Sequence, residues 1–452
     1  MQTESVDVVV IGGGPAGSTA STFLADKGYR VVLLEKERHP KFHIGESLLP
    51  CNMPVIAELG LMPRLREMGV LKLGADFSHA SDDRHRTYYF CKSLNGTAPH
   101  AYEVRRSEFD EMLFRNAAAR GVATHEGVKV TKVDFDATRS PRAGIVDAEQ
   151  VVDGVKTERR YRARYVVDAS GRDTFMSKKL GVKRKNPNHA SAAIFGHFEG
   201  VERRVGADQG NISIYWFDHG WMWMIPLRDD VMSVGAVCWP EYLKTRTGST
   251  EEFLAQTLAL APAAHARMKN AKRLGEVRAT GNYSYTSDEM TGPGFVMIGD
   301  AFAFVDPVFS SGVYLAMNSA KLAAEVVDGA LRDPSSEARL QAELEARVRK
   351  GIGSFSWFIY RFTSPAMRWI FKNPRNVFRL EEAIISMLAG DVFDSRAVDR
   401  RFRMLRFIYG VRAAMELPEY LSNLALRKKN AKTIFRGVTT VEGQPETVGF
   451  TD

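Results

Sequence analysis

The chain has 452 residues, a formal net charge of +8 and 44% hydrophobic residues, values that fit two or three globular domains and argue against intrinsic disorder. Its three cysteines, Cys51, Cys91 and Cys238, are too few and too scattered for a disulfide framework or a metal site. No segment resembles a signal peptide or a membrane span, and no nucleic-acid motif accompanies the basic charge. We therefore expect a cytoplasmic protein without a metal, a nucleic-acid partner or a membrane span.

A strand, a glycine-rich turn and a helix come first. Residues 7–11 are a β-branched run typical of a buried parallel strand, and residues 12–17 read Gly-Gly-Gly-Pro-Ala-Gly. A helix is predicted over residues 18–27, and a second strand over residues 29–34. This order of elements is the context that a dinucleotide-binding GxGxxG turn requires.

The glycines and the acid of this turn each have a physical task. Gly12 permits the tight turn, Gly14 lets the backbone approach a pyrophosphate, and Gly17 lets the helix pack closely on the strand. The pyrophosphate would lie at the helix N-terminus, where free N–H groups favour anions. Glu35, after the second strand, can accept hydrogen bonds from ribose hydroxyls. The alternative is a tight turn without a ligand; the pattern favours a dinucleotide and does not say which one.

Two later segments also read as buried strands that end at polar turns. Residues 164–170 run into Gly171-Arg172, and residues 295–298 run into Gly299-Asp300-Ala301. A carboxylate directly after such a strand, followed by a new helix, suits a hydrogen bond to a ribityl hydroxyl. These segments are candidates for the same ligand site.

The middle and the end of the chain differ in pattern. Residues 185–283 contain four predicted strands with short polar turns, which indicates an antiparallel sheet. Residues 331–452 are mainly helical by periodicity. We therefore predict an α/β protein with a discontinuous Rossmann-like domain over residues 1–184 and 284–330, an antiparallel-sheet substrate domain and a helical C-terminal region.

Two tryptophans share a predicted strand. Trp221 and Trp223 stand at i and i+2, so their side chains point to the same face, with Gly220 before them and Pro226 after. Packing in a protein core is the more common explanation for such a pair. The dinucleotide turn favours the alternative, a pair of aromatic plates beside a redox cofactor.

Two further stretches carry polar groups that invite a ligand. In residues 306–313 (DPVFSSGV) the N–H groups of Ser310, Ser311 and Gly312 would face the mouth of a new helix, where a small anion or a cofactor edge could lie. Lys72 stands among largely apolar neighbours, so it must extend to solvent or face a polar cavity. A solvated surface lysine is the ordinary explanation.

Three of these motifs together resemble the FAD-dependent monooxygenase superfamily. They are the glycine-rich turn with Glu35, residues 168–172 (DASGR) and residues 299–301 (GDA), which occur in the order that the superfamily has. The resemblance covers residues 5 to about 320. It implies a single FAD domain assembled from discontinuous segments.

Three other motifs resemble flavin-dependent halogenases within that superfamily. Residues 220–226 (GWMWMIP) resemble the GWxWxIP signature, residues 306–312 resemble DPxxSxG, and residues 72–77 (KLGADF) resemble a K-x-G-A-x-F segment. The resemblance implies halogenation that depends on FADH2, O2 and halide and proceeds through hypohalous acid.

The same resemblance implies roles for individual residues. Lys72 would be the catalytic lysine, the backbone amides of Ser311 and Gly312 would hold halide, and a tunnel would be lined by Trp221, Trp223 and Pro226. The implied FAD-binding positions are Gly12, Gly14, Ala16, Gly17, Glu35, Ser47, Arg106, Val130, Asp300, Gly312 and Val313. FAD would be supplied reduced by a separate flavin reductase, and chloride or bromide would be the co-substrate.

One departure bears on the substrate. Tryptophan halogenases carry a glutamate directly before the S-x-G segment, where this chain has Phe309. An uncharged site cannot stabilise a cationic ring intermediate, so the ring must be activated by itself, as phenols and pyrroles are. The chain therefore resembles the phenol- and pyrrole-type branch, in which many substrates are tethered to acyl or peptidyl carrier proteins. Arg400-Arg401 and Arg427-Lys428-Lys429 could meet an acidic carrier or be solvated helix faces.

Other functions share part of this pattern. A flavin hydroxylase or a reductase of the geranylgeranyl-reductase type would need the flavin motifs but not Lys72 together with Trp221 and Trp223. A non-catalytic flavin-binding protein is the third alternative. The combination of motifs favours the halogenase.

Overall fold

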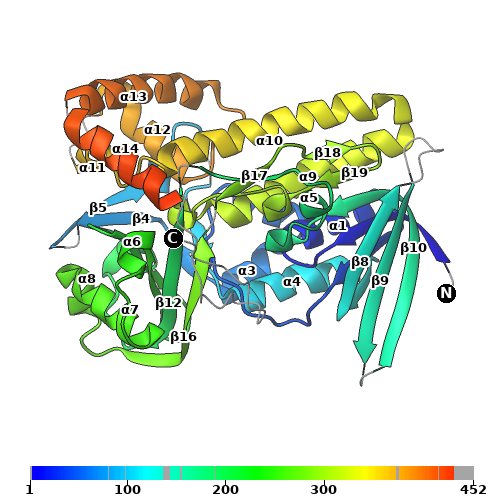
Figure 1. The fold of residues 1–452 in the computed structure, drawn as a ribbon, viewed down its shortest axis with the longest axis horizontal. Coiled ribbons are helices and arrows are strands. Elements are labelled where there is room, and N and C mark those ends of the chain that lie inside the picture. The colour runs from blue at the N-terminus through cyan, green and yellow to red at the C-terminus, as the bar shows by residue number, and fades with distance from the viewer. Residues whose placement is uncertain are drawn as a thin grey trace.

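Two large sheets and a group of C-terminal helices make up the protein (Figure 1). The computed structural model describes residues 3–79, 81–96, 98–135, 143–152, 155–187, 189–282, 284–372, 376–415 and 417–431. No helix among these residues is both long and apolar enough to cross a lipid bilayer.

The first sheet carries the glycine-rich turn. Its path is β18-β19-β10-β1-β2-β7, in which β19, β10, β1, β2 and β7 run parallel. The strands are β1 (Thr3–Ile11), β2 (Val31–Glu35), β7 (Ala123–Glu126), β10 (Val155–Asp168), β18 (Thr291–Gly292) and β19 (Phe295–Met297). Ile11 pairs with Leu34 and with Asp168, so the carboxyl ends of three strands lie level. Ligands of parallel sheets bind beyond these ends.

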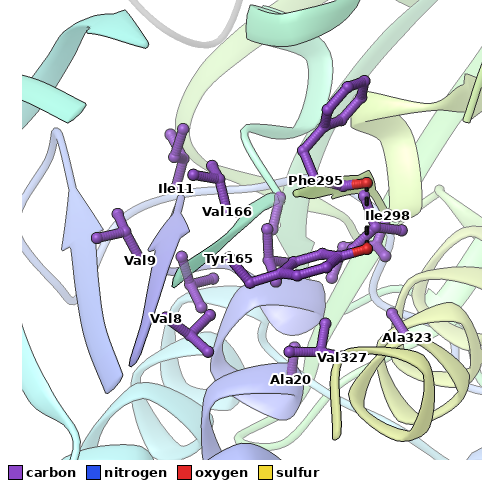
Figure 2. Close-up of a cluster of buried hydrophobic side chains, with 14 of the residues drawn as sticks. Val8, Val9, Ile11, Ala20, Tyr165, Val166, Phe295, Ile298, Ala323 and Val327 are labelled. Carbon is purple, nitrogen blue, oxygen red and sulfur yellow. Dashed lines mark hydrogen bonds between the residues drawn. The ribbon is translucent and has the colours of Figure 1, made fainter. Parts of the chain in front are cut away.

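Helices on the faces of this sheet complete its core. They include α1 (Pro15–Asp26), α4 (Arg106–Ala119) and α9 (Ser311–Arg332). Figure 2 shows strand residues Val8, Val9, Tyr165 and Val166 with Ala20 of α1 and with Ala323 and Val327 of α9, all at most 1% exposed. β-Branched side chains suit the buried strands, and the small alanines let the helices approach them.

A hairpin extends the first sheet away from the rest of the molecule. It consists of β8 (Val128–Phe135) and β9 (Gly144–Val152), and β9 pairs with the first part of β10 (Figure 1). All of these pairings are antiparallel.

The second sheet carries the two tryptophans. Its order is β16-β12-β15-β14-β13-β4-β5, and every pair is antiparallel except β13 with β4. The strands are β4 (Gly74–His79), β5 (Asp82–Tyr89), β12 (Ser191–Glu199), β13 (Ile212–Phe217), β14 (Gly220–Pro226), β15 (Val231–Cys238) and β16 (Lys272–Asn282). The four strands predicted between residues 185 and 283 are therefore present, and β4 and β5 join them from residues 74–89.

Each face of the second sheet has its own cover. Three short helices, α6 (Pro240–Leu243), α7 (Thr250–Ala259) and α8 (Pro262–Arg267), lie on one side. The C-terminal helices α10 (Glu337–Ile359), α11 (Pro365–Lys372), α12 (Leu380–Leu388) and α13 (Arg396–Met415) pack on the other, followed by α14 (Leu417–Ala431) (Figure 1). The tryptophan face is thus enclosed by the helical C-terminal region.

Two smaller sheets lie between these parts along the chain. The pair β3 (Val70–Lys72) and β6 (Ala101–Glu103) lies just before β4 and α4 in the chain, and it positions the lysine that the sequence singled out. A three-stranded sheet of β11 (Lys183–Lys185), β17 (Tyr285–Ser287) and β20 (Ala303–Phe304) leads into the segment before α9.

Candidate active site

The glycine-rich turn is built for close approach. A Cβ atom on Gly17 would overlap the carbonyl oxygen of Gly12, whose own φ is +100°, so strand and helix meet without room for side chains. A Cβ atom on Gly14 would meet nothing within 4 Å, which leaves open space at the start of α1. Ala16 lies in the buried first turn of that helix. The turn therefore offers the N-terminus of α1 to an anion.

Glu35 braces this turn from the end of β2. Its carboxylate accepts hydrogen bonds from the N–H of Gly13 at 2.7 Å and from the N–H of Glu37 at 2.8 Å, and Nζ of Lys41 lies 2.8 Å away. Burial alone would raise the pKa of Glu35, but the Lys41 ammonium and these donors outweigh it and lower the pKa. Glu35 is an ionised acceptor beside the turn.

Arg106 and Asp300 lie in two other segments that reach this region. The guanidinium of Arg106 donates twice to Asp110, at 2.8 Å each, and once to the carbonyl of Ile44 at 3.0 Å. Burial raises the pKa of Asp300 to about 6, against the opposing charges of Arg172 and Arg106. Asp300 follows β19 in a short helical turn, at the carboxyl edge where the sequence placed it.

Val130 differs from the other predicted cofactor positions. It lies on β8 opposite Ala148, and its side chain belongs to the apolar core of the first sheet. Val130 therefore offers no polar side-chain group to a ligand.

The segment before α9 is held by a buried carboxylate. Oδ2 of Asp306 accepts from Nε2 of His189 at 2.9 Å and from Oγ of Ser191 at 3.2 Å, while Oδ1 accepts from the N–H of Val308 at 3.2 Å. Ser310 adopts a left-handed conformation with φ +55°. Asp306 therefore anchors the segment, and the left-handed Ser310 precedes the first residue of the helix.

The first residues of α9 leave room for a small ligand. The N–H of Ser310, which the sequence suggested as a free donor, instead donates to the carbonyl of Pro307 at 2.8 Å. Ser311 and Gly312 are the first two residues of the helix, whose N–H groups have no partner within it. Oγ of Ser311 is buried and has no hydrogen-bond partner among the described residues, and a Cβ on Gly312 would meet nothing within 4 Å. These features fit an anion or a cofactor edge.

Phe309, directly before Ser310, is an uncharged residue. It is 3% exposed, and its ring lies edge-on to Phe362 with centroids 5.1 Å apart. An apolar ring therefore fills the position before Ser310.

Lys72 is buried, so the ordinary explanation of a solvated lysine does not apply. It is 1% exposed, and its Nζ donates to Oγ of Ser47 at 2.7 Å and to the carbonyl of Leu48 at 3.0 Å. Burial lowers the pKa of Lys72, and Glu103 opposes that shift. Leu48 belongs to the same buried apolar cluster as Val313 of α9.

The two tryptophans point to one face, as their spacing predicted. Trp221 and Trp223 are 4% and 5% exposed, with ring centroids 5.7 Å apart. Nε1 of Trp223 donates to Oγ of Ser233 at 3.2 Å. Both rings belong to the large buried cluster that also contains Phe309, so both take part in core packing. Pro226 ends β14 opposite Met232.

Two buried glutamates escaped the sequence analysis. Oε1 of Glu103 lies 3.8 Å from Nζ of Lys72, and Oε1 of Glu46 lies 2.8 Å from Nε2 of His197. Glu103 ends a three-residue strand, β6, which pairs with the strand of Lys72. The long-range pairing itself could not be read from the chain.

One group of side chains has metal-ligand spacing within the described part of the chain, where the sequence predicted no metal. Ligand atoms of Asp76, His85 and Asp208 lie within 4.8 Å of one another. Nε of Arg204 lies 3.8 Å from Asp76, and Asn211 donates to both aspartates. The protein's own donors therefore already compensate the two carboxylates.

Comparisons with known proteins give this site a context. A sequence model of the FAD binding domain family matches residues 5–350. The chain is 30% identical over 447 residues to the 1H-pyrrole-2-carbonyl-(peptidyl-carrier protein) chlorinase of Pseudomonas fluorescens, an alignment that covers 93% of this chain and 96% of that protein. It is 36% identical over 328 residues to tryptophan 2-halogenase of Chondromyces crocatus, covering 72% of this chain and 61% of that longer protein.

A solved structure has the same fold. The myxobacterial chondrochloren halogenase CndH superimposes with a TM-score of 0.74 at 33% identity, covering 90% of this chain and 97% of the other. The open space at Gly14 fits the phosphate of a dinucleotide at the N-terminus of α1, and the open space at Gly312 leaves room for a small ligand at the start of α9.

Proposed function

Because this chain belongs to the FAD binding domain family and, within it, to the flavin-dependent halogenases, we propose that it halogenates a phenol or a pyrrole held on a carrier protein. The observation that carries this substrate class is Phe309, a buried apolar ring where a carboxylate would be needed for a less reactive ring. A ring that stabilises its own cationic intermediate needs no such carboxylate. The chlorinase of Pseudomonas fluorescens, named for a carrier-bound pyrrole, supports this choice.

The enzyme is an FAD-dependent oxidoreductase with halide as co-substrate. When bound, FAD supplies the oxygen chemistry that converts halide into hypohalous acid. The glycine-rich turn, Glu35, Arg106 and Asp300 are the residues that would bind and orient this cofactor. The sequence holds no second dinucleotide turn, which supports a separate flavin reductase as the source of reduced FAD.

The protein's own residues guide the halogen in three steps. The amides of Ser311 and Gly312 hold halide at the N-terminus of α9, where the helix dipole favours an anion. Trp221 and Trp223 separate the cofactor from the substrate and exclude water along the path. Lys72 then binds hypohalous acid and orients its halogen towards the ring carbon.

Helix α13 supports a carrier protein as partner. Arg400 is exposed there, and the same helix exposes the apolar side chains of Phe407, Val411 and Met415. Such a mixture of basic and apolar groups complements an acidic carrier. Arg401, in contrast, donates to the carbonyl of Phe378. Lys429 pairs with Glu241 at 2.8 Å, and the side chain of Arg427 lies outside the described residues.

A product assay tests the proposal. The enzyme would be incubated with a flavin reductase, FAD, and chloride or bromide. The substrates would be a pyrrole-2-carboxyl and a hydroxybenzoyl ring, each free and carrier-tethered, and free tryptophan. Mass spectrometry should find a halogenated tethered ring, and no product from free tryptophan. Halogenated tryptophan with untouched phenols and pyrroles would overturn the substrate class.

The role of Lys72 is tested in the same assay. We expect Lys72→Ala to lose product by at least about a hundredfold, because proton-donating groups contribute about 10²–10⁴-fold to such reactions. FAD binding, measured by flavin absorbance, should remain. Lys92→Ala is the matched control, since Lys92 is exposed. Normal halogenation by Lys72→Ala would show that another group orients the halogen.

A further inference from the structure

Lys72 and Glu103 form a buried pair of opposite charges between strands β3 and β6. Nζ of Lys72 lies 3.8 Å from Oε1 of Glu103, and both residues are 1% exposed. No described residue donates to either oxygen of Glu103 with full hydrogen-bond geometry, although the side chains of Lys72 and Ser47 lie close enough to lower the pKa of Glu103. A carboxylate in such a place is unfavourable unless a nearby charge compensates it. Lys72 is the cation that lies within reach.

The secondary structure brings the two side chains to one face. Strands β3 and β6 are antiparallel, and Lys72 pairs with Ala101. Glu103 is two residues further along β6, so its side chain points to the same side as that of Ala101. A backbone bridge between Ser47 and Glu103 brings the serine that Lys72 contacts to the same place. The pair is therefore set by strand register and not by flexible loops.

The surroundings of Nζ favour the ammonium form of Lys72. Nζ donates to Ser47 and to the carbonyl of Leu48, and the ring centre of Phe90 lies 5.4 Å away. A carbonyl oxygen, a carboxylate and the face of an aromatic ring each attract a cation. Burial acts in the opposite sense and lowers the pKa of Lys72. The charge state of the lysine therefore depends on its negative partner.

The remaining charged groups act more weakly on the pair or on its neighbours. They are Asp76 on β4, Glu46, His197 on β12 and Arg106 on α4. Asp76 raises the pKa of Lys72 less than Glu103 does. Burial raises the pKa of Glu103 to about 7; Lys72 and the Ser47 hydroxyl oppose that shift, and Glu46 adds to it. Glu103 is thus the main negative charge that Lys72 faces above neutral pH.

We propose that Glu103 is a positioning residue that keeps Lys72 in its ammonium form, so that the lysine acts as a charged hydrogen-bond donor and not as a neutral amine. This inference rests on the proposed role of Lys72 in halogen transfer. In that step the ring carbon attacks the halogen and the O–X bond breaks. The leaving hydroxide takes a proton from the ammonium and becomes water. The neutral amine then accepts the proton that the ring loses, which restores the ammonium.

A titration of Lys72 tests the pairing without any measurement of activity. The FAD-loaded protein would carry ¹³C at lysine Cε, and the Lys72 resonance would be assigned by its loss in Lys72→Arg. We expect Glu103→Gln to lower the titration midpoint of Lys72 by one pH unit or more, because a charge partner at this distance shifts a pKa by about 1–3 units. An unchanged midpoint would overturn the proposal.

Two further variants keep the test sharp. Glu337→Gln is the matched control, because Glu337 is a buried carboxylate that binds Gly294 and Gln341 far from this pair. It should leave the midpoint of Lys72 where it is. Glu103→Asp keeps the charge at a greater distance, so its midpoint should fall between those of wild type and Glu103→Gln. If Glu103→Gln does not fold, the Asp variant alone decides.

The pH profile of halogenation gives the second readout. If the ammonium is the active form, the alkaline limb of turnover should move to lower pH in Glu103→Gln, by the same amount as the midpoint. An acid limb that moves instead would mean that the neutral amine is active, and would overturn the proposal. Normal halogenation by Lys72→Ala would refute the role of the lysine, while the titration would still decide the pairing.

Discussion

A single missing side chain makes room for Trp223. Gly235 on β15 pairs with Trp223 on the neighbouring strand β14. A Cβ atom on Gly235 would overlap the indole ring and the side chain of Phe195. The backbone of Gly235 has no positive φ, so glycine is needed there for space and not for conformation. The position of the Trp223 ring therefore depends on the absence of a side chain at Gly235 on the neighbouring strand.

Gly235→Ala tests this dependence. Overpacking should destabilise the protein by about 1–3 kcal/mol, because the indole must move or the strands must separate. The free energy of unfolding in denaturant measures the cost, and the fluorescence of the folded protein reports the displaced tryptophan. Gly353→Ala on α10 is the control, since a Cβ there meets nothing within 4 Å. Equal stability of the two variants would show that the site relaxes freely.

At the scale of the element, the start of α9 depends on a carboxylate that lies outside it. Asp306 links the segment before the helix to His189 and Ser191, at the beginning of the second sheet. The same residue accepts the N–H of Val308. The N–H groups at the start of a helix bind an anion well only if the start of the helix has a fixed position. Asp306 fixes the segment before α9 to the second sheet, and so supports the geometry of the proposed halide site.

Asp306→Ala should therefore affect both stability and halide use. Loss of the acceptor leaves His189 and Ser191 with unpaired buried groups, at a cost of about 1–3 kcal/mol for each group. We expect a higher KM for halide in the product assay, with FAD binding retained. Asp333→Ala is the matched control, because Asp333 accepts the N–H of Ser335 at an exposed turn. An unchanged halide KM would separate Asp306 from the proposed halide site.

At the scale of the whole molecule, one aromatic cluster joins three parts of the chain. Phe362 follows α10. Its ring centroid lies 4.9 Å from that of Trp216 in the second sheet and 5.1 Å from that of Phe309 before α9. Phe77 of β4 and Phe371 of α11 also contact it, each at 5.8 Å. The helical C-terminal region thus packs tightly against the face of the second sheet that carries the tryptophans.

Phe362→Ala should loosen this packing. A fully buried phenylalanine replaced by alanine costs about 3–5 kcal/mol. Hydrogen exchange of α11, α12 and α13 should rise, because these helices would open more often than the first sheet. Phe407→Ala removes the same atoms from an exposed position of α13 and should change stability by no more than about 0.5 kcal/mol. Uniform exchange across both sheets would contradict a separate C-terminal unit.

Local patterns were sufficient for much of the fold. The strand at β1, the glycine-rich turn and the helix α1 follow from β-branched residues and glycines that act over a few positions. The shared face of Trp221 and Trp223 follows from the two-residue period of a strand. The strands of the second sheet between residues 191 and 238 were also predicted within a few residues of their observed ends.

Long-range pairing was decided by the tertiary structure alone. Nothing local in residues 74–89 places β4 beside β13, and nothing local places Glu103 beside Lys72, because strand pairing depends on which distant surfaces fit together. The sequence by itself determined the kind of chemistry, because each motif is a short run of residues that can be recognised without knowing what lies next to it in space. The tertiary structure decided the electrostatics of the lysine, because burial and a partner from another strand set its charge.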